Sequence, residues 1–167
     1  MMNEYELRKL LNDSELVELR INEGISCKLI TKTNSKEEIK GHFEKSEHNL
    51  LFLENISADF NDWKFVVCYY AAYHAALALV ASKGFASKSH DATLCLLIKY
   101  FYESGLSKED IEMFNKFDVQ DLLFYAESKY KRENAQYSTK INFETNDVND
   151  MKLKTKLFVN KAKELCF

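Results

Sequence analysis

The sequence predicts an all-α fold: an antiparallel bundle of four to five helices, preceded by an N-terminal helical extension. Three observations lead to this prediction. The 167 residues contain no proline and only four glycines, and these two residue types interrupt helices most strongly. Apolar residues recur at three- and four-residue steps through most of the chain, which is the period of an amphipathic helix. One stretch, residues 63–81, is apolar on nearly every side, so other helices must cover it.

The predicted central helix is this stretch, WKFVVCYYAAYHAALALVA, which has no charged residue after Lys64 until Lys83. Its alanines let neighbouring helices approach closely, and its tyrosines add bulk with a polar tip. We expect one face to be left for a second copy of the chain. The residues expected in the core or at this dimer interface are Tyr69, Tyr70, Tyr73, His74 and, in the next helix, His90. A membrane span is disfavoured, because tyrosines and a histidine occupy the middle of the stretch and no basic flank follows it.

The first 34 residues are expected to contain helix followed by a connector. Residues 3–22 fit one helix or two short ones, because the Asn-Asp-Ser sequence at 12–14 can end one helix and cap the next. Gly24 is expected to end this helical part. Residues 25–34 fit a strand or an extended connector, and the pattern leaves both open.

We divide the chain into an N-terminal extension, residues 1–34, and a helical bundle, residues 35–167. Hydroxyls followed three residues later by a carboxylate fit a capping box, in which side chains satisfy the free amides of a first helical turn. The first helix of the bundle is expected to start at Ser35 and to end near Asn55, the second to start at Asp59 or Asn61 and to end at Gly84, and the third to start at Ser87 or Ser89 and to end at Ser104-Gly105. The fourth is expected to start at Ser107 and to continue through Ser128, and the pattern leaves a break near Asp118 open. A polar loop over 133–146 and a last helix that starts at Asp147 follow.

Composition and charge narrow the class of protein. The net charge is −3. Nucleic-acid-binding proteins usually have an excess of basic residues, so this charge argues weakly against a dedicated nucleic-acid-binding protein. The four cysteines are scattered without a C-x-x-C pair, so we expect reduced thiols, in particular at Cys68 and Cys95. His42 and His48 are six residues apart and lie on different faces of a helix, so we expect no metal site there and no cofactor. The acidic start MMNEYELRKLL lacks the pattern of a signal peptide, and we expect a cytoplasmic protein.

A group of residues in and after the central helix carries a family resemblance. These residues are Tyr69-Tyr70-Ala71, His74-Ala75-Ala76, Gly84 and Lys88-Ser89-His90. Together they resemble the signature of the HEPN superfamily, in particular its small stand-alone proteins. The resemblance covers about residues 35–166 and is most specific over 68–97. It implies a bundle of four or five helices and a homodimer across the central helices.

The resemblance also implies a candidate active site. Active members of the family are metal-independent endoribonucleases, and one branch carries an arginine, four residues, a tyrosine, one residue and a histidine. This chain has Arg132 and Tyr137 at the first two positions but Thr139 at the third. An arginine can supply the cation over the developing phosphorane charge. Threonine does not titrate near neutral pH and cannot be the general base for the 2′-hydroxyl proton.

This substitution leaves two hypotheses. The preferred one is a non-catalytic or weakly active homodimer that binds a nucleotide, RNA or a protein partner, in a toxin–antitoxin or defence system. The other is an active ribonuclease toxin that uses Arg132 and a displaced base, for which His74 and His90 are candidates. The branch in which the tyrosine is adenylylated, here Tyr137, implies a nucleotidyltransferase partner. The side chains expected to hold nucleotide or RNA are Lys129, Lys131, Arg132 and Lys140.

These site residues also have structural interpretations. Arg132 lies where the fourth helix is expected to end, and a cation there interacts favourably with the helix carbonyls. His90 is expected to make local contacts at a helix start. The lysines of the last helix, within 152–163, fit a solvated face better than a binding surface. A purely structural protein with residues 1–34 as a docking element is a third interpretation that the sequence leaves open.

Overall fold

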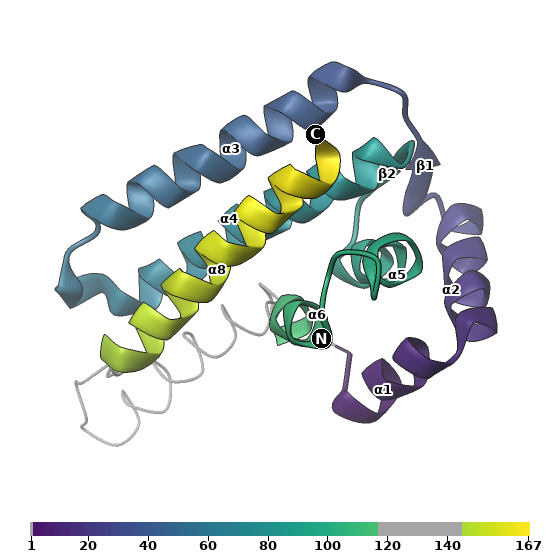
Figure 1. Cartoon of the computed structure of the whole chain (residues 1–167), viewed down its shortest axis with the longest axis horizontal. Helices are drawn as coiled ribbons and strands as arrows, with labels where there is room; N and C mark the ends of the chain where they lie inside the picture. Colours follow the sequence, from purple (N-terminus) through teal and green to yellow (C-terminus); the bar gives the residue numbers. More distant parts are fainter. Residues whose placement is uncertain (1, 117–144) are drawn as a thin grey trace.

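The computed structural model describes residues 2–116 and 145–167, and in this part of the chain the fold is all-α, as the sequence predicts (Figure 1). A small two-stranded antiparallel sheet is the exception. The elements are α1 (Glu4–Asn12), α2 (Ser14–Ser26), β1 (Ile30–Lys32), α3 (Lys36–Asn55), a 3₁₀ turn η1 (Ala58–Phe60), α4 (Asn61–Ser82), β2 (Phe85–Ser87), α5 (His90–Phe101), α6 (Lys108–Lys116) and α8 (Thr145–Cys166).

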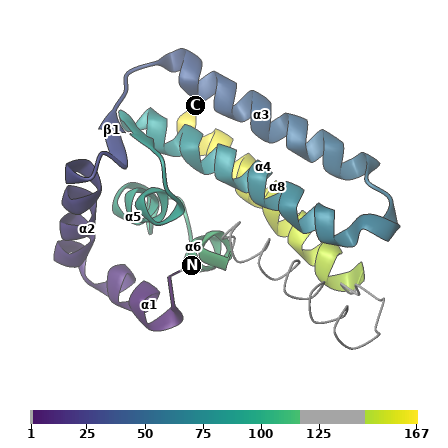
Figure 2. The same cartoon turned by 180° about the vertical axis from the view of Figure 1, so that it is seen from behind.

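The long helices α3, α4 and α8 lie side by side and form one half of the described part (Figures 1 and 2). Helices α3 and α4 are an antiparallel hairpin, and α8 packs along α4. Helix α5 lies beside them, with α1 and α2 wrapped around its outer side and α6 following it (Figure 2). The N-terminal helices are therefore packed against the bundle, because α2 contacts α5 and β1 pairs with β2.

Helix α4 is the core helix of this arrangement. Its alanines are fully buried and allow α3 and α8 to approach its backbone. The Ser46 hydroxyl of α3 donates to the Ala71 carbonyl at 2.7 Å, and the Cys166 thiol of α8 lies 3.8 Å from the Ala78 carbonyl. Within the described residues, the window Trp63–Ser82 is the one long and apolar enough to cross a membrane, but most of it is buried inside the protein. That burial is typical of the core helix of a soluble protein.

The helix starts that depend on local capping agree with the sequence. The break between α1 and α2 falls at Asp13, whose carboxylate accepts the Leu16 amide at 2.9 Å. Ser89 is the cap of α5, and it accepts the Ala92 amide. Ser107 and Asp110 form the reciprocal contacts of a capping box at the start of α6. These contacts join residues three apart, so the sequence alone can specify them.

The N-terminal segment resolves one open question and corrects one prediction. Residues 30–32 form a strand, with Ile30 paired to Ser87. Gly24 does not end α2, which continues to Ser26. The glycine instead leaves room for Ile30, since a Cβ there would lie 2.8 Å from the Cδ1 atom of Ile30 and that side chain would have to shift. Its missing side chain lets the buried Ile30 fold back over the helix.

Other boundaries differ from the sequence prediction. The residue before α4 is Phe60, without a side-chain cap, so neither Asp59 nor Asn61 caps this helix. Helix α5 ends at Phe101, three residues before the predicted Ser104-Gly105. The turn that follows spans residues 103–105, and its positive φ of 62° falls at Glu103.

The start of α8 is also shifted. It begins at Thr145, two residues before the predicted Asp147. The predicted continuation of the fourth helix and nearly all of the predicted loop over 133–146 lie outside the described residues.

Two glycines allow a matched test of backbone conformation. Gly84 follows α4 at a φ of +81°, as predicted, whereas Gly41 lies inside α3 with open space around its Cα. We expect Gly84→Ala to lower the free energy of unfolding by about 1 kcal/mol, because a Cβ is strained in the left-handed region. Gly41→Ala should raise it by about 0.5–1 kcal/mol, because alanine favours a helix interior. Urea unfolding followed by far-UV circular dichroism measures both, and equal signs would contradict the interpretation.

Candidate functional site

The site residues predicted from the sequence fall into two groups. Arg132, Tyr137 and the lysines Lys129, Lys131 and Lys140 lie outside the described residues. The aromatic and histidine residues lie within them: Tyr69, Tyr70, Tyr73 and His74 on α4, and His90 as the first residue of α5. The candidate site that the structure describes therefore consists of the second group and the side chains in contact with it.

An aromatic column crosses the bundle from α4 to α8. Tyr69 stacks on Tyr73 with ring centroids 5.3 Å apart, and Tyr73 lies parallel to His90 at 6.2 Å. The His90 ring stacks on Phe114 of α6 at 4.4 Å and 7°, and Phe114 faces Phe158 of α8 at 6.2 Å. His90 is therefore packed among rings from other helices. It contributes to the packing between helices in addition to standing at the start of α5.

The hydroxyl of Tyr73 is held in its protonated form. Burial raises the pKa of Tyr73 above its ordinary value, and a hydrogen bond with Thr93 opposes that shift in part. Thr93 is itself fully buried, and its hydroxyl donates to the Ser89 carbonyl at 2.8 Å and lies 2.9 Å from the Ser87 hydroxyl. The network connects α4 to the start of α5. The raised pKa keeps the Tyr73 phenol neutral at pH 7.

His74 meets a histidine that the sequence did not pair with it. Its Nδ1 atom lies 3.2 Å from Nδ1 of His42 on α3. Burial, followed by the charges of His42 and Lys45, lowers the pKa of His74 to about 4. Burial also lowers the pKa of His42, while Glu38 opposes that shift. At neutral pH His74 is therefore uncharged, and a group of such low basicity is poorly matched to general-base catalysis near pH 7.

The outer side of α4 carries exposed aromatic residues. The Trp63 side chain is 56% exposed and that of Tyr70 is 41% exposed. They are seven residues apart, which places them on the same side of a helix two turns apart. Tyr70 packs edge-on against the buried Tyr69 at 5.0 Å. This arrangement leaves apolar surface on the core helix that the described part of the chain does not cover.

The lysines of α8 are engaged in ion pairs with acids. Lys152 and Lys156 both bind the Glu54 carboxylate of α3, and their hydrogen bonds lower the pKa of Glu54. The remaining pairs are Lys154 with Asp150, Lys161 with Asp110 and Lys163 with Glu47. Most of these lysines connect α8 to α3 or α6, so their charge is compensated and offers an RNA backbone little net attraction.

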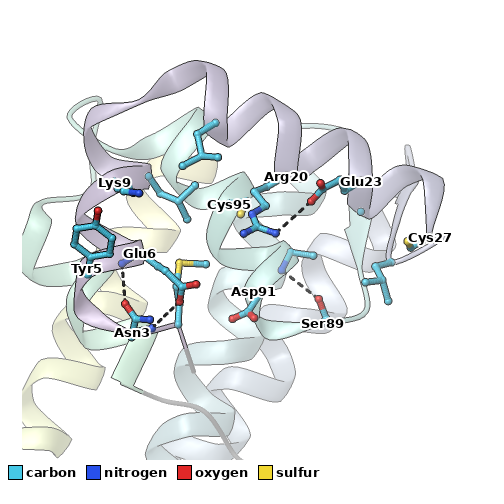
Figure 3. Close-up of a pocket in the computed structure, with 16 residues that line it drawn as sticks. Asn3, Tyr5, Glu6, Lys9, Arg20, Glu23, Cys27, Ser89, Asp91 and Cys95 are labelled. Atoms are coloured by element: carbon cyan, nitrogen blue, oxygen red, sulfur yellow. Dashed lines mark hydrogen bonds and ion pairs between the residues drawn. The ribbon is translucent and has the colours of Figure 1, made fainter.

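A cleft of about 880 Å³ lies between α1, α2 and the start of α5 (Figure 3). Arg20 and Glu23 point toward one another at 3.3 Å along its α2 wall, and Asp91 lies on the α5 side. Acids and bases are mixed along its walls, so it has no single charge sign that would select a phosphate or a cation. The sequence pattern does not reveal this cleft, because the cleft depends on the packing of the N-terminal helices on α5.

Burial keeps the thiols of Cys68 and Cys95 protonated. All four cysteines of the chain lie in the described residues and are free. Cys95 lines the cleft, and burial, followed by the Asp91 carboxylate, raises its pKa to about 11. Burial also raises the pKa of Cys68 to about 11. Both thiols are therefore protonated at neutral pH and are poor nucleophiles. Among the described residues, no three His, Cys, Asp or Glu side chains come together as a metal site.

Comparison with known proteins gives a coarse assignment. No family model matches the chain. A protein of Methanocaldococcus jannaschii, named "Putative toxin MJ0142", is 25% identical over 136 residues, which cover 81% of this chain and 86% of that protein. The chain is similar to this protein over most of both lengths.

Proposed function

We propose that this chain is a HEPN-like, toxin-related cytoplasmic protein that acts as a homodimer and binds RNA or a nucleotide with little or no cleavage. Its place would be a toxin–antitoxin or defence system, where a protein partner such as a nucleotidyltransferase would act on it. The proposal is supported by the all-α fold, by the residue pattern around His74 and His90, and by the toxin-named relative.

The observation that carries the proposal is the threonine at position 139. Arg132 can bind a phosphate and Tyr137 can pack against it, but Thr139 supplies no base. Among the described residues, His74 is a weak base because its pKa is about 4, and His90 is stacked on Phe114. A site that binds phosphate without proton transfer loses about 10²–10⁴-fold in rate.

The homodimer is supported by the exposed side of α4. Trp63 and Tyr70 are large aromatic side chains that the described residues leave exposed, on a helix whose other apolar side chains are buried or half-buried. Exposed apolar surface of this kind marks interaction sites in soluble proteins. In a dimer across α4 the two chains would cover each other's Trp63 and Tyr70 and bring their Arg132 regions into one assembly.

The alternative function is a metal-independent endoribonuclease toxin that uses Arg132 and a displaced base. The observation that favours it is the name of the relative, which describes a toxin. Many toxins act by an enzymatic step, so the two functions must be separated by experiment.

Purified full-length protein should bind a labelled hairpin RNA in EDTA without cutting it. We expect Arg132→Ala to weaken binding about tenfold or more, because one charge-assisted contact to phosphate is lost. The matched control is Arg8→Ala, an exposed arginine on α1, which should leave binding unchanged. Fluorescence anisotropy measures binding and gel electrophoresis measures cleavage.

Two results would overturn the proposal. Cleavage that disappears in Arg132→Ala would establish the ribonuclease alternative. Equal RNA affinity of the wild type and Arg132→Ala would remove the arginine from the binding site. Light scattering on the same sample should give the mass of two chains, and the mass of one chain at micromolar concentration would contradict the homodimer.

A further inference from the structure

Two histidines from different helices face one another between α3 and α4. The Nδ1 atoms of His42 and His74 are 3.2 Å apart, and the ring centroids are 5.4 Å apart. Two imidazole nitrogens bound to one tetrahedral zinc ion at about 2.0–2.1 Å are themselves about 3.3 Å apart. The separation of the two nitrogens therefore already matches the spacing that a shared metal ion requires.

A buried hydrogen bond joins the two helices that carry these rings. Ser46, one turn after His42, donates to the carbonyl of Ala71, which lies one turn before His74. Ser46 and Ala71 are both fully buried. Because the two helices are joined one turn from the rings, the pair is ordered before any ion binds. Ordering of the ligands in advance lowers the entropic cost of binding.

Solvent access, nearby charges and further side chains around His42 and His74 determine which ligand this pair can bind. Both rings are only half-buried, so water can reach them. Glu38 lies one turn before His42 and places a negative charge near it, whereas Lys45 places a positive charge near both rings. Within the described residues no third side chain completes a protein-only site. The described part of the chain therefore offers two protein ligands, His42 and His74.

We infer that His42 and His74 bind a divalent transition-metal ion of the zinc class through their facing nitrogens, with water completing its coordination. Imidazole is a favoured ligand for zinc, nickel and copper, and carboxylate-preferring magnesium and calcium are excluded by the nitrogen donors. The rings point toward one another, so the ion replaces the hydrogen they share after a small rotation of each side chain. The bound ion connects α3 to α4. The inference is independent of RNA binding and of the residues around Arg132.

The test uses full-length protein and zinc chloride alone, followed by calorimetry and by thermal unfolding. Every variant carries Cys27→Ser, because the exposed Cys27 thiol is another zinc ligand. We expect zinc to raise the Tm of this background, since an ion that binds only the folded state stabilises it. His42→Ala and His74→Ala should each lower zinc affinity by about tenfold or more, as loss of one of two ligands removes the chelate. Far-UV circular dichroism establishes that each variant is folded, and His42→Gln is the second variant at that position.

The matched control is His48→Ala, which removes an exposed histidine from the same helix. It should bind zinc as the background does. The inference is overturned if the background binds no zinc, if His42→Ala and His74→Ala bind it equally well, or if His48→Ala loses as much affinity as they do. The last result would mean zinc binding at surface histidines only.

Discussion

Replacing Thr139 with histidine is expected to raise cleavage of a structured RNA by about 10²–10⁴-fold. The substitution completes the pattern of Arg132, Tyr137 and a histidine that the family resemblance implies for active members. The imidazole provides the base that threonine lacks, and Arg132 provides the positive charge for the transition state. Because this chemistry needs no metal, the gain should persist in EDTA. Cleavage rates of wild type and variant, measured with one labelled hairpin, give the ratio directly.

Two controls separate a restored site from a contaminating nuclease. Thr139→Ala should stay as inactive as the wild type, because alanine also lacks a titratable group. Adding Arg132→Ala to the Thr139→His variant should remove most of the gained activity. If Thr139→His cuts no faster than Thr139→Ala, the assignment of these residues to one site is wrong. If the wild type already cuts as fast, the displaced-base alternative is the better function.

Phe114→Ala is expected to have the largest effect on stability, about 3–5 kcal/mol. The Phe114 ring is fully buried and stacks on His90 at 4.4 Å. It also lies within 6.3 Å of the Tyr73 and Phe158 rings. Its removal leaves a cavity where α4, α5, α6 and α8 meet. Since a domain is stable by only about 5–15 kcal/mol in total, this loss is a large share.

Urea unfolding followed by far-UV circular dichroism measures this loss. The control is Phe52→Ala, because the Phe52 ring on α3 is 54% exposed and its loss should change the free energy by less than about 0.5 kcal/mol. A cost below about 1 kcal/mol for Phe114→Ala would show that the neighbouring side chains collapse into the space. The aromatic column would then have no central part in the fold.

The agreement between sequence and structure is closest where contacts are local. Asp13, Ser89 and Ser107 each bond an amide or carboxylate within three residues of themselves. Gly84 adopts the positive φ expected after a helix end. Such signals involve neighbours along the chain, so the sequence contains them in full. The start of α4 is an exception, because Phe60 precedes this helix and makes no side-chain capping hydrogen bond.

The candidate site was predicted only in part. The sequence nominated His74 and His90, but not that His74 faces His42 or that His90 stacks on Phe114. His42 and His48 share a helix, whereas the contact of His42 with His74 joins residues 32 positions apart. The lysines of α8 were expected on a solvated face, and their acid partners on α3 and α6 were not foreseen. Nothing in the spacing of residues specifies such pairs.

The sequence by itself determined the helical class, the apolar core helix around residues 63–81 and the absence of a histidine after Arg132. Periodicity and residue chemistry act over a few positions and do not depend on how helices are arranged. Only the tertiary structure decided which faces meet: α2 on α5, His42 on His74, and the cleft between the N-terminal helices and the start of α5. These contacts depend on the rotation and crossing of whole helices, and helix packing sets those by summing many small side-chain contacts.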